Sequence, residues 1–334
     1  MAEMVTVALD AMGGDYAPHE PVLAAVEAVK ERDDIRVVLV GKEDIIRKEL
    51  KQYNDIPKNR IRIQNASEVI EMAEPPVVAI RSKKDSSIVV GLYMVKHGEA
   101  DAFVSSGSTG AVLVGGQVIV GRIKGVERPP LAPLIPTTRG VSLLLDCGAN
   151  VDARASHLVP CAKMGSIYMR DIVGVENPTV GIVNIGAEEE KGNALVKETF
   201  PLLKECQDIN FIGSVEARDI PSGAADVIVC EAFTGNVIIK TFEGVAKTLV
   251  SEIKKGLMSS LVGKLGGLMI KPTLKKTLKR FDASEHGGAP LLGLKGLVVK
   301  THGSAKAVEI KHGIFQCAEF RQQKINEKIE ENLH

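Results

Sequence analysis

One pattern recurs along the chain and limits its possible folds more than any other feature. A short apolar, β-branched run is followed by a turn of glycine and small polar residues, and then by a helical stretch. Predicted strands of this kind cover residues 5–10, 37–40, 102–104, 141–145, 180–183, 227–229 and 297–299. Strands that alternate with helices indicate an α/β fold, with a largely parallel sheet covered by helices on both faces.

Length and composition are those of an ordinary globular protein. The 334 residues are enough for one large α/β domain or two medium ones, and we treat residues 1–334 as a single domain. Lys+Arg and Asp+Glu balance at 42 each, only 4% of the residues are aromatic, and Trp is absent. Neither a basic surface nor base-stacking platforms are indicated, so we do not expect nucleic-acid binding.

The cysteines are scattered and form no C-x-x-C pair, which predicts free thiols in a reducing cytoplasm. Most of them lie in or near apolar runs, where a small buried hydrophobic residue is expected more often than a nucleophile. The N-terminus does not resemble a secretory signal, and no apolar run is long enough to span a membrane. The residues concerned are Cys147, Cys161, Cys206, Cys230 and Cys317.

The loops that follow the predicted strands are the expected place for a ligand. Ligands of parallel sheets bind beyond the carboxyl ends of the strands, and helix N-termini offer unpaired N–H groups to anions. The richest loop is Ser105–Gly110, with the sequence Ser-Ser-Gly-Ser-Thr-Gly. A single loop of this composition is also explained as a turn and a helix cap. Several such loops together favour a phosphate-binding site.

Common motifs of covalent, metal and nucleotide chemistry are missing. The chain contains no G-x-x-x-x-G-K-[ST] loop, no G-x-G-x-x-G after the first strand and no G-x-S-x-G nucleophile elbow. Its histidines have no metal-ligand spacing. We therefore predict neither a metal nor a cofactor.

Residues 251–282 differ from the rest of the chain because lysines alternate with apolar residues. The apolar spacing predicts one stripe along a helix, and Gly263, Gly266, Gly267 and Pro272 predict a break into a hairpin with an apolar tip. The stripe either packs on protein or anchors the chain at an anionic membrane. The residues expected in that contact are Leu257, Leu261, Lys264, Leu265, Leu268 and Lys271.

Several loops, taken in order, resemble those of the bacterial phosphate acyltransferase (PlsX) family over essentially the full length. The matching segments are residues 10–15, 81–87, 105–111, 146–150, 184–186, 190–192, 233–236 and 287–294. Glu231-Ala232 departs from the pattern, because such proteins more often have Asp-Gly there. That difference weakens any role assigned to this carboxylate.

The resemblance implies a three-layer α/β/α sandwich similar to phosphotransacetylases and isocitrate dehydrogenase-like proteins, with a protruding helical hairpin. It implies a homodimer that transfers a fatty acyl group from acyl carrier protein to inorganic phosphate, in phospholipid synthesis. It also implies a cytoplasmic enzyme held peripherally at an anionic membrane, where a membrane acyltransferase would use the acyl phosphate.

The family's chemistry suggests roles for the strand-end residues. Phosphate itself can attack the thioester, so the enzyme has to hold phosphate and stabilise the oxyanion. We expect Asp10, Asp146 and Asn184 to orient the groups that do so, and Arg81 or Lys191 to supply positive charge. His157 or Lys163 is a candidate to protonate the departing thiol. The predicted phosphate- and substrate-binding residues are Gly13, Gly14, Arg81, Ser105, Ser106, Gly107, Ser108, Thr109, Gly110, Asn150, Asn184 and Asn236.

Two other functions remain open from the sequence. One is an NAD(P)-dependent dehydrogenase of the isocitrate dehydrogenase-like type, whose sheet architecture is related. The other is a non-enzymatic scaffold that uses only the lysine-rich hairpin, for which the strand-end loops would be dispensable.

Overall fold

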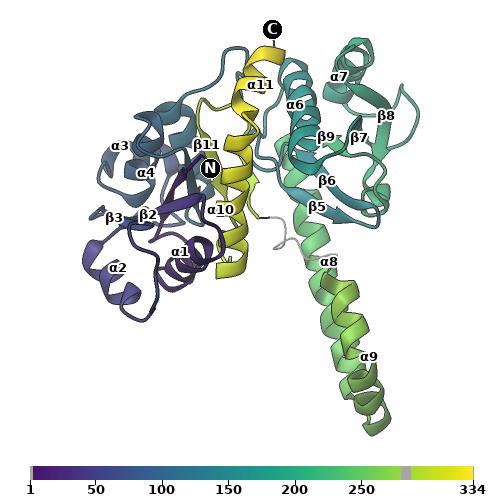
Figure 1. Ribbon diagram of the computed structural model, residues 1–334. Helices are drawn as coiled ribbons and strands as arrows, with labels where there is room; N and C mark the ends of the chain where they lie inside the picture. Colours follow the sequence, from purple (N-terminus) through teal and green to yellow (C-terminus); the bar gives the residue numbers. More distant parts are fainter. Residues whose placement is uncertain (1–2, 280–286, 334) are drawn as a thin grey trace.

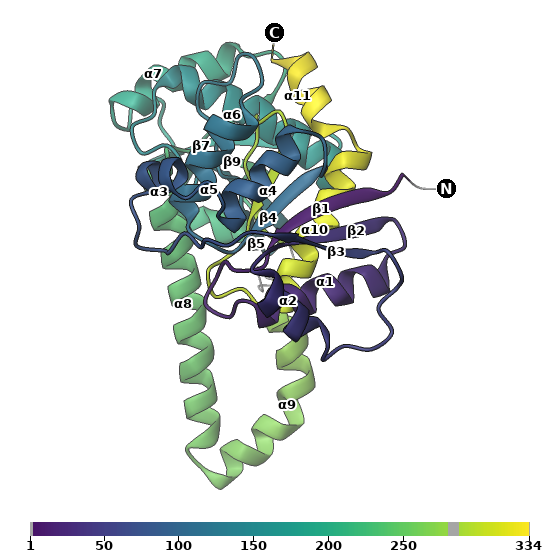
Figure 2. The same cartoon turned by 90° about the vertical axis from the view of Figure 1, so that its left-hand side faces the viewer.

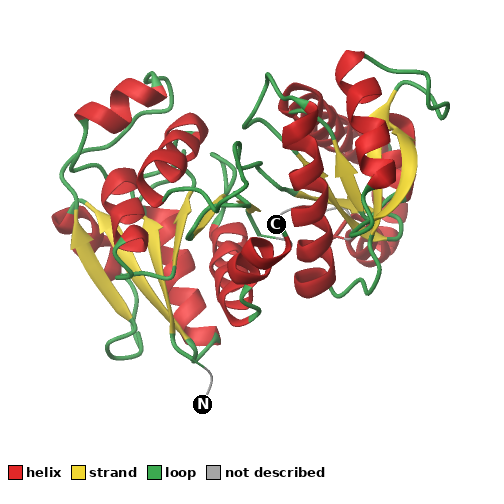
Figure 3. Ribbon diagram, turned by 90° about the horizontal axis from the view of Figure 1, so that it is seen from above, coloured by secondary structure: helices red, strands yellow, loops and turns green. Residues whose placement is uncertain are grey.

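The strands form two largely parallel sheets, one on each side of the long helix α10 (Figure 1). The computed structural model describes residues 3–279 and 287–333. Helices cover both faces of each sheet, as the view from above shows (Figure 3). The predicted α/β class is confirmed, but the strands divide between two sheets instead of forming one.

The first sheet has the order β10-β11-β4-β1-β2-β3. All neighbours are parallel except β10, which pairs antiparallel with β11. Its strands are β1 Val5–Asp10, β2 Ile35–Gly41, β3 Ile61–Asn65, β4 Ala102–Ser105, β10 Ala289–Pro290 and β11 Leu297–Lys300.

The second sheet has the order β5-β6-β9-β7-β8, and here only β5 is antiparallel to its neighbour. Its strands are β5 Leu134–Thr137, β6 Gly140–Leu145, β7 Thr179–Asn184, β8 Asn210–Glu216 and β9 Val227–Val229. Two short pairings tie the sheets together: Ala132 N donates to Pro290 O, and Leu292 N donates to Pro130 O.

Side-chain alternation along the buried strands sends neighbouring residues into different layers. Val7 and Leu9 of β1 join the core that includes α1 and α10, whereas Ala8 joins the core beneath α4 and α5. The helices around the first sheet are α1 His19–Glu31, α2 Glu43–Leu50, α3 Pro76–Ser82, α4 Ser87–Lys96, α5 Thr109–Gly115, its π-helical continuation Gly116–Val120, and α10 Ala307–Gln322.

Around the second sheet, α6 and α7 cover one face, and the base of α8 packs on the other. The elements are α6 Ala155–Tyr168 with a π-helical turn Met169–Val173, α7 Ala194–Glu205, a 3₁₀ helix Ala217–Ser222, α8 Ala232–Met258 and α9 Leu261–Lys279. The chain ends in two helices, α10 and α11 Ile325–Asn332, which are separated where Lys324 adopts a left-handed conformation.

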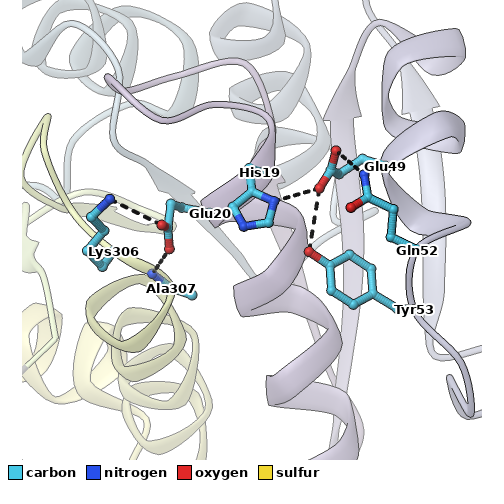
Figure 4. A network of polar contacts seen from close by, with 7 residues as sticks. All are labelled: His19, Glu20, Glu49, Gln52, Tyr53, Lys306 and Ala307. Atoms are coloured by element: carbon cyan, nitrogen blue, oxygen red, sulfur yellow. Dashed lines mark hydrogen bonds and ion pairs between the residues drawn. The ribbon is translucent and has the colours of Figure 1, made fainter.

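A polar network joins α1 to α10 and to α2 (Figure 4). The Glu20 carboxylate accepts from the Ala307 amide at 2.7 Å, so α1 supplies a cap for the first turn of α10. Its other oxygen pairs with Lys306 at 3.2 Å. On the α2 side, Glu49 binds His19 at 2.7 Å. These contacts fix where α10 begins, directly after the loop that follows β11.

The hairpin projects away from the body of the protein (Figures 1 and 2). Its first arm is the outer part of α8, which begins at Ala232, well before the predicted boundary at residue 251. The chain turns at Ser259 and Ser260. Helix α9 then continues through the three glycines and Pro272 that were predicted to break it, so that prediction was wrong. Residues 280–282 of the predicted segment lie outside the described part of the chain.

The base of α8 packs so tightly on the second sheet that Gly235 has no space for a side chain. A Cβ there would lie 1.9 Å from the carbonyl oxygen of Asp146. We expect Gly235→Ala to lower the free energy of unfolding by about 3 kcal/mol or more, because the clash is with backbone. Gly244→Ala, in the same helix with nothing within 4 Å of its Cβ, should instead be stabilising by roughly 0.5–1 kcal/mol.

Chemical denaturation of both variants measures these effects. Equal stability of Gly235→Ala and Gly244→Ala would contradict the packing of α8 on the Asp146 loop.

Candidate functional site

Three adjacent strands of the first sheet end in a row of polar side chains. Lys300 of β11 lies opposite Ser105 of β4 in the strand register. Asp10 of β1 continues the register on the other side of β4, where Leu9 pairs with Val104. Carboxylate, hydroxyl and ammonium groups therefore share one face at the carboxyl edge of the sheet.

Asp10 is almost completely buried, with 1% of its surface exposed. Its oxygens accept from Ser105 Oγ at 2.7 Å and from Met12 N at 3.0 Å. Burial raises the pKa of Asp10, while hydrogen bonds from Ser87, Ser105, Met12 and Gly13 oppose that rise. The carboxylate thus holds the loops after β1 and β4 together.

Lys300 was not among the predicted site residues, although it ends an apolar strand as Asp10 does. Only 6% of its surface is exposed, and its ammonium donates to the carbonyl oxygen of Thr301. Burial lowers the pKa of Lys300 to about 8, against the opposing influence of Glu309, Asp10 and Asp15. The sequence signal was a lysine at the end of Leu297–Lys300, a pattern that also fits an exposed strand end.

Most hydroxyl groups of the Ser105–Gly110 loop make hydrogen bonds to other residues of the chain. Ser105 Oγ binds Asp10 and accepts from Gly107 N at 3.0 Å, and Ser106 Oγ lies 2.7 Å from Thr301 Oγ1. Ser108 is the N-cap of α5, where it accepts from Ala111 N. The Thr109 hydroxyl makes no hydrogen bond to the described residues. The first-turn amides of Thr109 and Gly110 have no acceptor within α5, as at any helix start.

The two glycines after β1 let this loop approach the Ser105–Gly110 loop closely. A Cβ on Gly13 would lie 2.3 Å from Asp10 Oδ2 and 2.6 Å from the amide nitrogen of Gly107. Gly14 has φ +96°, a left-handed conformation that favours glycine. The predicted residues of the first sheet therefore form one continuous cluster: Asp10, Gly13, Gly14 and residues 105–110.

The second sheet carries a similar buried carboxylate, Asp146, directly after β6. It accepts from the amides of Leu131 at 2.9 Å and Asn150 at 2.9 Å, and from Asn150 Nδ2 at 2.6 Å. Burial raises the pKa of Asp146, and these hydrogen bonds oppose the rise. Asn150 also donates to Pro129 O at 3.2 Å, while its buried Oδ1 has no hydrogen-bond partner among the described residues.

Helix α8 starts beside this loop. The Glu231 carboxylate is its N-cap and accepts from Phe233 N at 2.6 Å and Thr234 N at 3.0 Å. The departure from the family pattern at this position therefore retains a capping group. Asn236 Oδ1 lies 4.0 Å from the position of a Cβ on Gly148, which places this side chain against the Asp146–Asn150 loop.

Asn184 ends β7 and organises the loop that carries Lys191. Its Nδ2 donates to Lys191 O at 3.2 Å and to Ser214 Oγ at 3.0 Å, and its Oδ1 accepts from Ile185 N at 2.8 Å. The Lys191 ammonium pairs with Glu188 at 2.8 Å, and both side chains are about half exposed. Such a surface pair contributes little stability, so the ammonium is free to exchange partners.

Three predicted residues lie apart from these clusters or are otherwise engaged. His157 is buried at the start of α6, accepts from Arg154 N through Nδ1 and contacts Glu127 through Nε2 at 3.0 Å. Lys163 pairs with Asp208. Asp208 precedes β8 and so lies at the amino ends of the parallel strands, away from the carboxyl edge. Arg81 is exposed on α3 and makes no hydrogen bond or ion pair with the described residues.

The cysteines are free thiols, and all except Cys206 are buried. Cys147, which follows Asp146, is 6% exposed. Burial and the neighbouring Asp146 raise the pKa of its thiol to about 12. The thiol is therefore protonated near neutral pH, which fits the expected structural role.

The hairpin exposes much of its predicted apolar stripe. Leu261, Leu265 and Leu268 have exposed fractions of 79%, 67% and 68%. Leu257 is half-buried and lies within the hairpin, 3.5 Å from the position of a Cβ on Gly267. Lys264 and Lys271 are exposed. Within residues 3–279 and 287–333, no helix has both the length and the apolar character required to cross a bilayer.

Comparison with known proteins identifies the family. A family model described as "Fatty acid synthesis protein" matches residues 5–328. A phosphate acyltransferase of Clostridium botulinum (strain ATCC 19397 / Type A) is 49% identical over 329 residues, covering 98% of this chain and 97% of that protein. A phosphate acyltransferase of Alkaliphilus oremlandii is also 49% identical, over 327 residues, covering 98% and 97%.

Solved structures agree with the fold. The EutD phosphotransacetylase of Staphylococcus aureus gives a TM-score of 0.61 at 18% identity, covering 95% of this chain and 94% of that one. A phosphotransacetylase of Streptococcus pyogenes gives 0.61 at 17% identity, covering 94% and 93%. The predicted phosphotransacetylase-like architecture is confirmed.

The buried ammonium of Lys300 makes stability depend on pH. Its folded-state pKa of about 8 lies below the usual 10.5, so the unfolded state binds more protons between these values. We expect the stability of the wild type to rise relative to Lys300→Met as pH increases from 7 to 10.5. The difference corresponds to at most about 3 kcal/mol.

Urea denaturation of both proteins across this pH range measures the effect. Lys295→Met, which removes an exposed lysine just before β11, controls for the loss of one positive charge. If the stabilities of wild type and Lys300→Met change with pH in the same way, the lowered pKa of Lys300 is contradicted.

Proposed function

This chain belongs to the phosphate acyltransferase (PlsX) family, and we propose that it transfers a fatty acyl group from acyl carrier protein to inorganic phosphate. The products are acyl phosphate and free carrier thiol, and the pathway served is phospholipid synthesis. The family relationship supports an acyltransferase and not the dehydrogenase alternative.

The observation that carries this proposal is the cluster of Asp10, Ser105 and Lys300 beside the start of α5. It combines a buried cation with the Thr109 hydroxyl and the first-turn amides of α5, all at the carboxyl edge of the sheet. Amides at a helix start and a nearby ammonium are the groups that hold phosphate in proteins. We assign phosphate to this cluster and propose that Asn236 and Lys191, from the second sheet, also contact it.

The reaction requires positioning more than covalent catalysis. A phosphate oxygen attacks the thioester carbon, a C–O bond forms, and the C–S bond breaks as the thiolate leaves. Holding phosphate next to the carbonyl replaces a bimolecular encounter, and N–H or cationic donors stabilise the oxyanion between the two steps. No nucleophilic side chain is needed, in keeping with the buried, protonated Cys147.

Three buried polar residues fit the role of positioning groups. Asp10 holds Ser105 and the turn at Met12, Asp146 holds Asn150, and Asn184 holds the backbone of Lys191. Each connects a strand end to the loop that would contact substrate. We therefore assign these residues to orientation and not to proton transfer.

The leaving thiol does not require a dedicated acid, since a thiolate is an acceptable leaving group near neutral pH. Both ring nitrogens of His157 are engaged by Arg154 and Glu127, and Lys163 pairs with Asp208 at the opposite edge of the sheet. We therefore propose no acid role for Lys163 and regard His157 as a cap of α6.

The direct test is incubation of the protein with palmitoyl acyl carrier protein, with and without phosphate. We expect thiol release that depends on phosphate. Thr109→Val should raise the KM for phosphate by about 10- to 150-fold, because one hydrogen bond to a charged group is lost. Ser108→Ala should lower stability by about 1 kcal/mol through loss of the α5 cap. Thiol release that is independent of phosphate would rule out the proposed function.

The hairpin is the proposed membrane contact. Its exposed leucines and lysines, including Leu261, Leu265, Lys264 and Lys271, provide apolar area and positive charge on one projecting element. Each basic residue near an anionic surface adds roughly 1 kcal/mol. Peripheral attachment there would deliver acyl phosphate close to a membrane acyltransferase.

We also propose that the protein is a homodimer, and analytical ultracentrifugation measures this.

Flotation with vesicles containing anionic lipid tests the membrane contact. Leu261→Glu and Leu268→Glu should each reduce the bound fraction several-fold, because a carboxylate opposes both apolar burial and the negative surface. Leu202→Glu, an equally drastic change at an exposed leucine of α7, should leave flotation unchanged. Equal flotation of all three variants would contradict the membrane contact and favour packing of the hairpin on protein.

A further inference from the structure

A pocket of about 250 Å³ lies at the carboxyl ends of β7 and β9. Its walls come from α6, from β7 and from the starts of α7 and α8. Leu158, Ile182, Leu195 and Val196 provide apolar lining, and Asn184 and Glu231 stand among its polar residues. None of the steps assigned above uses this space.

The polar residues around the pocket are already hydrogen-bonded within the chain. Asn184 uses both its amide nitrogen and its oxygen, in contacts of 2.8–3.2 Å. Glu231 caps α8 and also receives the Thr234 hydroxyl, and Asn193 Oδ1 accepts from Val196 N at 2.9 Å. A polar ligand would therefore lose its hydration without gaining partners from these side chains.

The remaining lining carries no free charge either. Cys230 is 4% exposed, and burial raises the pKa of its thiol well above the usual range, so it behaves as a small apolar residue. Leu158 and Ile182 are 2% and 0% exposed, which makes this part of the wall fixed core. An apolar ligand is the chemical class that suits such a cavity.

The pocket also lies next to the loops assigned to the reaction. Strand β9 separates β7 from β6 in the sheet, so the pocket is one strand away from the Asp146–Asn150 loop. Thr234 lines the pocket, and Asn236, two residues further along α8, faces Gly148 of that loop. A chain in the pocket would thus lie beside the Asp146–Asn150 loop, which is assigned to the orientation of the reacting groups.

We propose that this pocket binds hydrocarbon of the acyl chain and sets the chain length that the enzyme prefers. The inference rests on the proposed acyl transfer, since it identifies the ligand as the acyl part of that substrate. Leu195 and Val196, at the start of α7, form the part of the wall that a larger side chain would narrow.

Leu195→Trp is the test variant, and Val196→Phe is the second. The kcat/KM values for octanoyl and palmitoyl acyl carrier protein are compared at saturating phosphate. One methylene in a hydrophobic pocket changes this constant by about 10- to 200-fold. We expect the palmitoyl-to-octanoyl ratio to fall at least about 10-fold in each variant, with the KM for phosphate unchanged.

Leu202→Trp is the matched control, because Leu202 lies on the same helix, is 43% exposed and does not line the pocket. It should keep the wild-type ratio. An unchanged ratio in folded, active Leu195→Trp and Val196→Phe would overturn the proposal.

Binding of the fluorescent fatty acid cis-parinaric acid separates this inference from the proposed function. We expect wild type and Leu202→Trp to bind it alike, and Leu195→Trp to bind at least about 10-fold more weakly. If that difference is found but phosphate-dependent thiol release is not, the proposed function fails and the hydrocarbon site stands. Equal binding by all three proteins would overturn the pocket assignment.

Discussion

The site is organised around two carboxylates buried at strand ends. Asp10 and Asp146 are 1% and 2% exposed, and each lies at the end of a strand where water cannot solvate it. A buried carboxylate is tolerated only when hydrogen bonds replace its hydration. Asp10 therefore fixes Met12 and Ser105, and Asp146 fixes Leu131 and Asn150. The loops around them are shaped by this requirement.

The same requirement affects the charge that phosphate would meet. The negative charges of Asp10, Asp15 and Glu309 act on Lys300 and favour its charged form. Burial raises the pKa values of Asp10 and Glu309. Protonation of one of these carboxyls leaves the ammonium less neutralised, so the positive charge offered to an anion depends on how many protons the cluster holds. Hydrogen bonds to Asp10 favour its charged form, and burial favours its neutral form. The balance of these opposing effects sets the net charge of the cluster to which we assign phosphate.

Local features were readable from the sequence because they depend on neighbouring residues. The strands Val5–Asp10 and Val227–Val229 lie where apolar runs and turn residues predicted them. The division into two sheets depends on pairings between distant segments, such as β11 with β4, which periodicity does not reveal. Lys300 was missed for the same reason, since its burial comes from the packing of the surrounding elements.

The hairpin shows a different limit of local reasoning. Gly263, Gly266 and Gly267 have low helix propensity, yet α9 continues through them. A Cβ on Gly263 would lie 2.6 Å from the carbonyl oxygen of Leu257, so glycine permits the close approach of the two arms just after the turn. Tertiary contact thus outweighs helix propensity at Gly263, whereas Gly266 has nothing within 4 Å of its Cβ position.

Helix α8 connects the loops of the site to the tip of the hairpin without interruption. It has 27 residues, from the Glu231 cap to Met258. At 1.5 Å per residue, the stretch from Asn236 to Met258 spans roughly 33 Å. If the tip rests on a membrane, this helix sets an upper limit on the distance between that surface and Asn236. Gly235, packed on the Asp146 carbonyl, anchors the other end. The proposed membrane contact and the proposed site are therefore linked by one continuous helix, and an acyl phosphate formed at the strand-end loops would have to leave them to reach the bilayer.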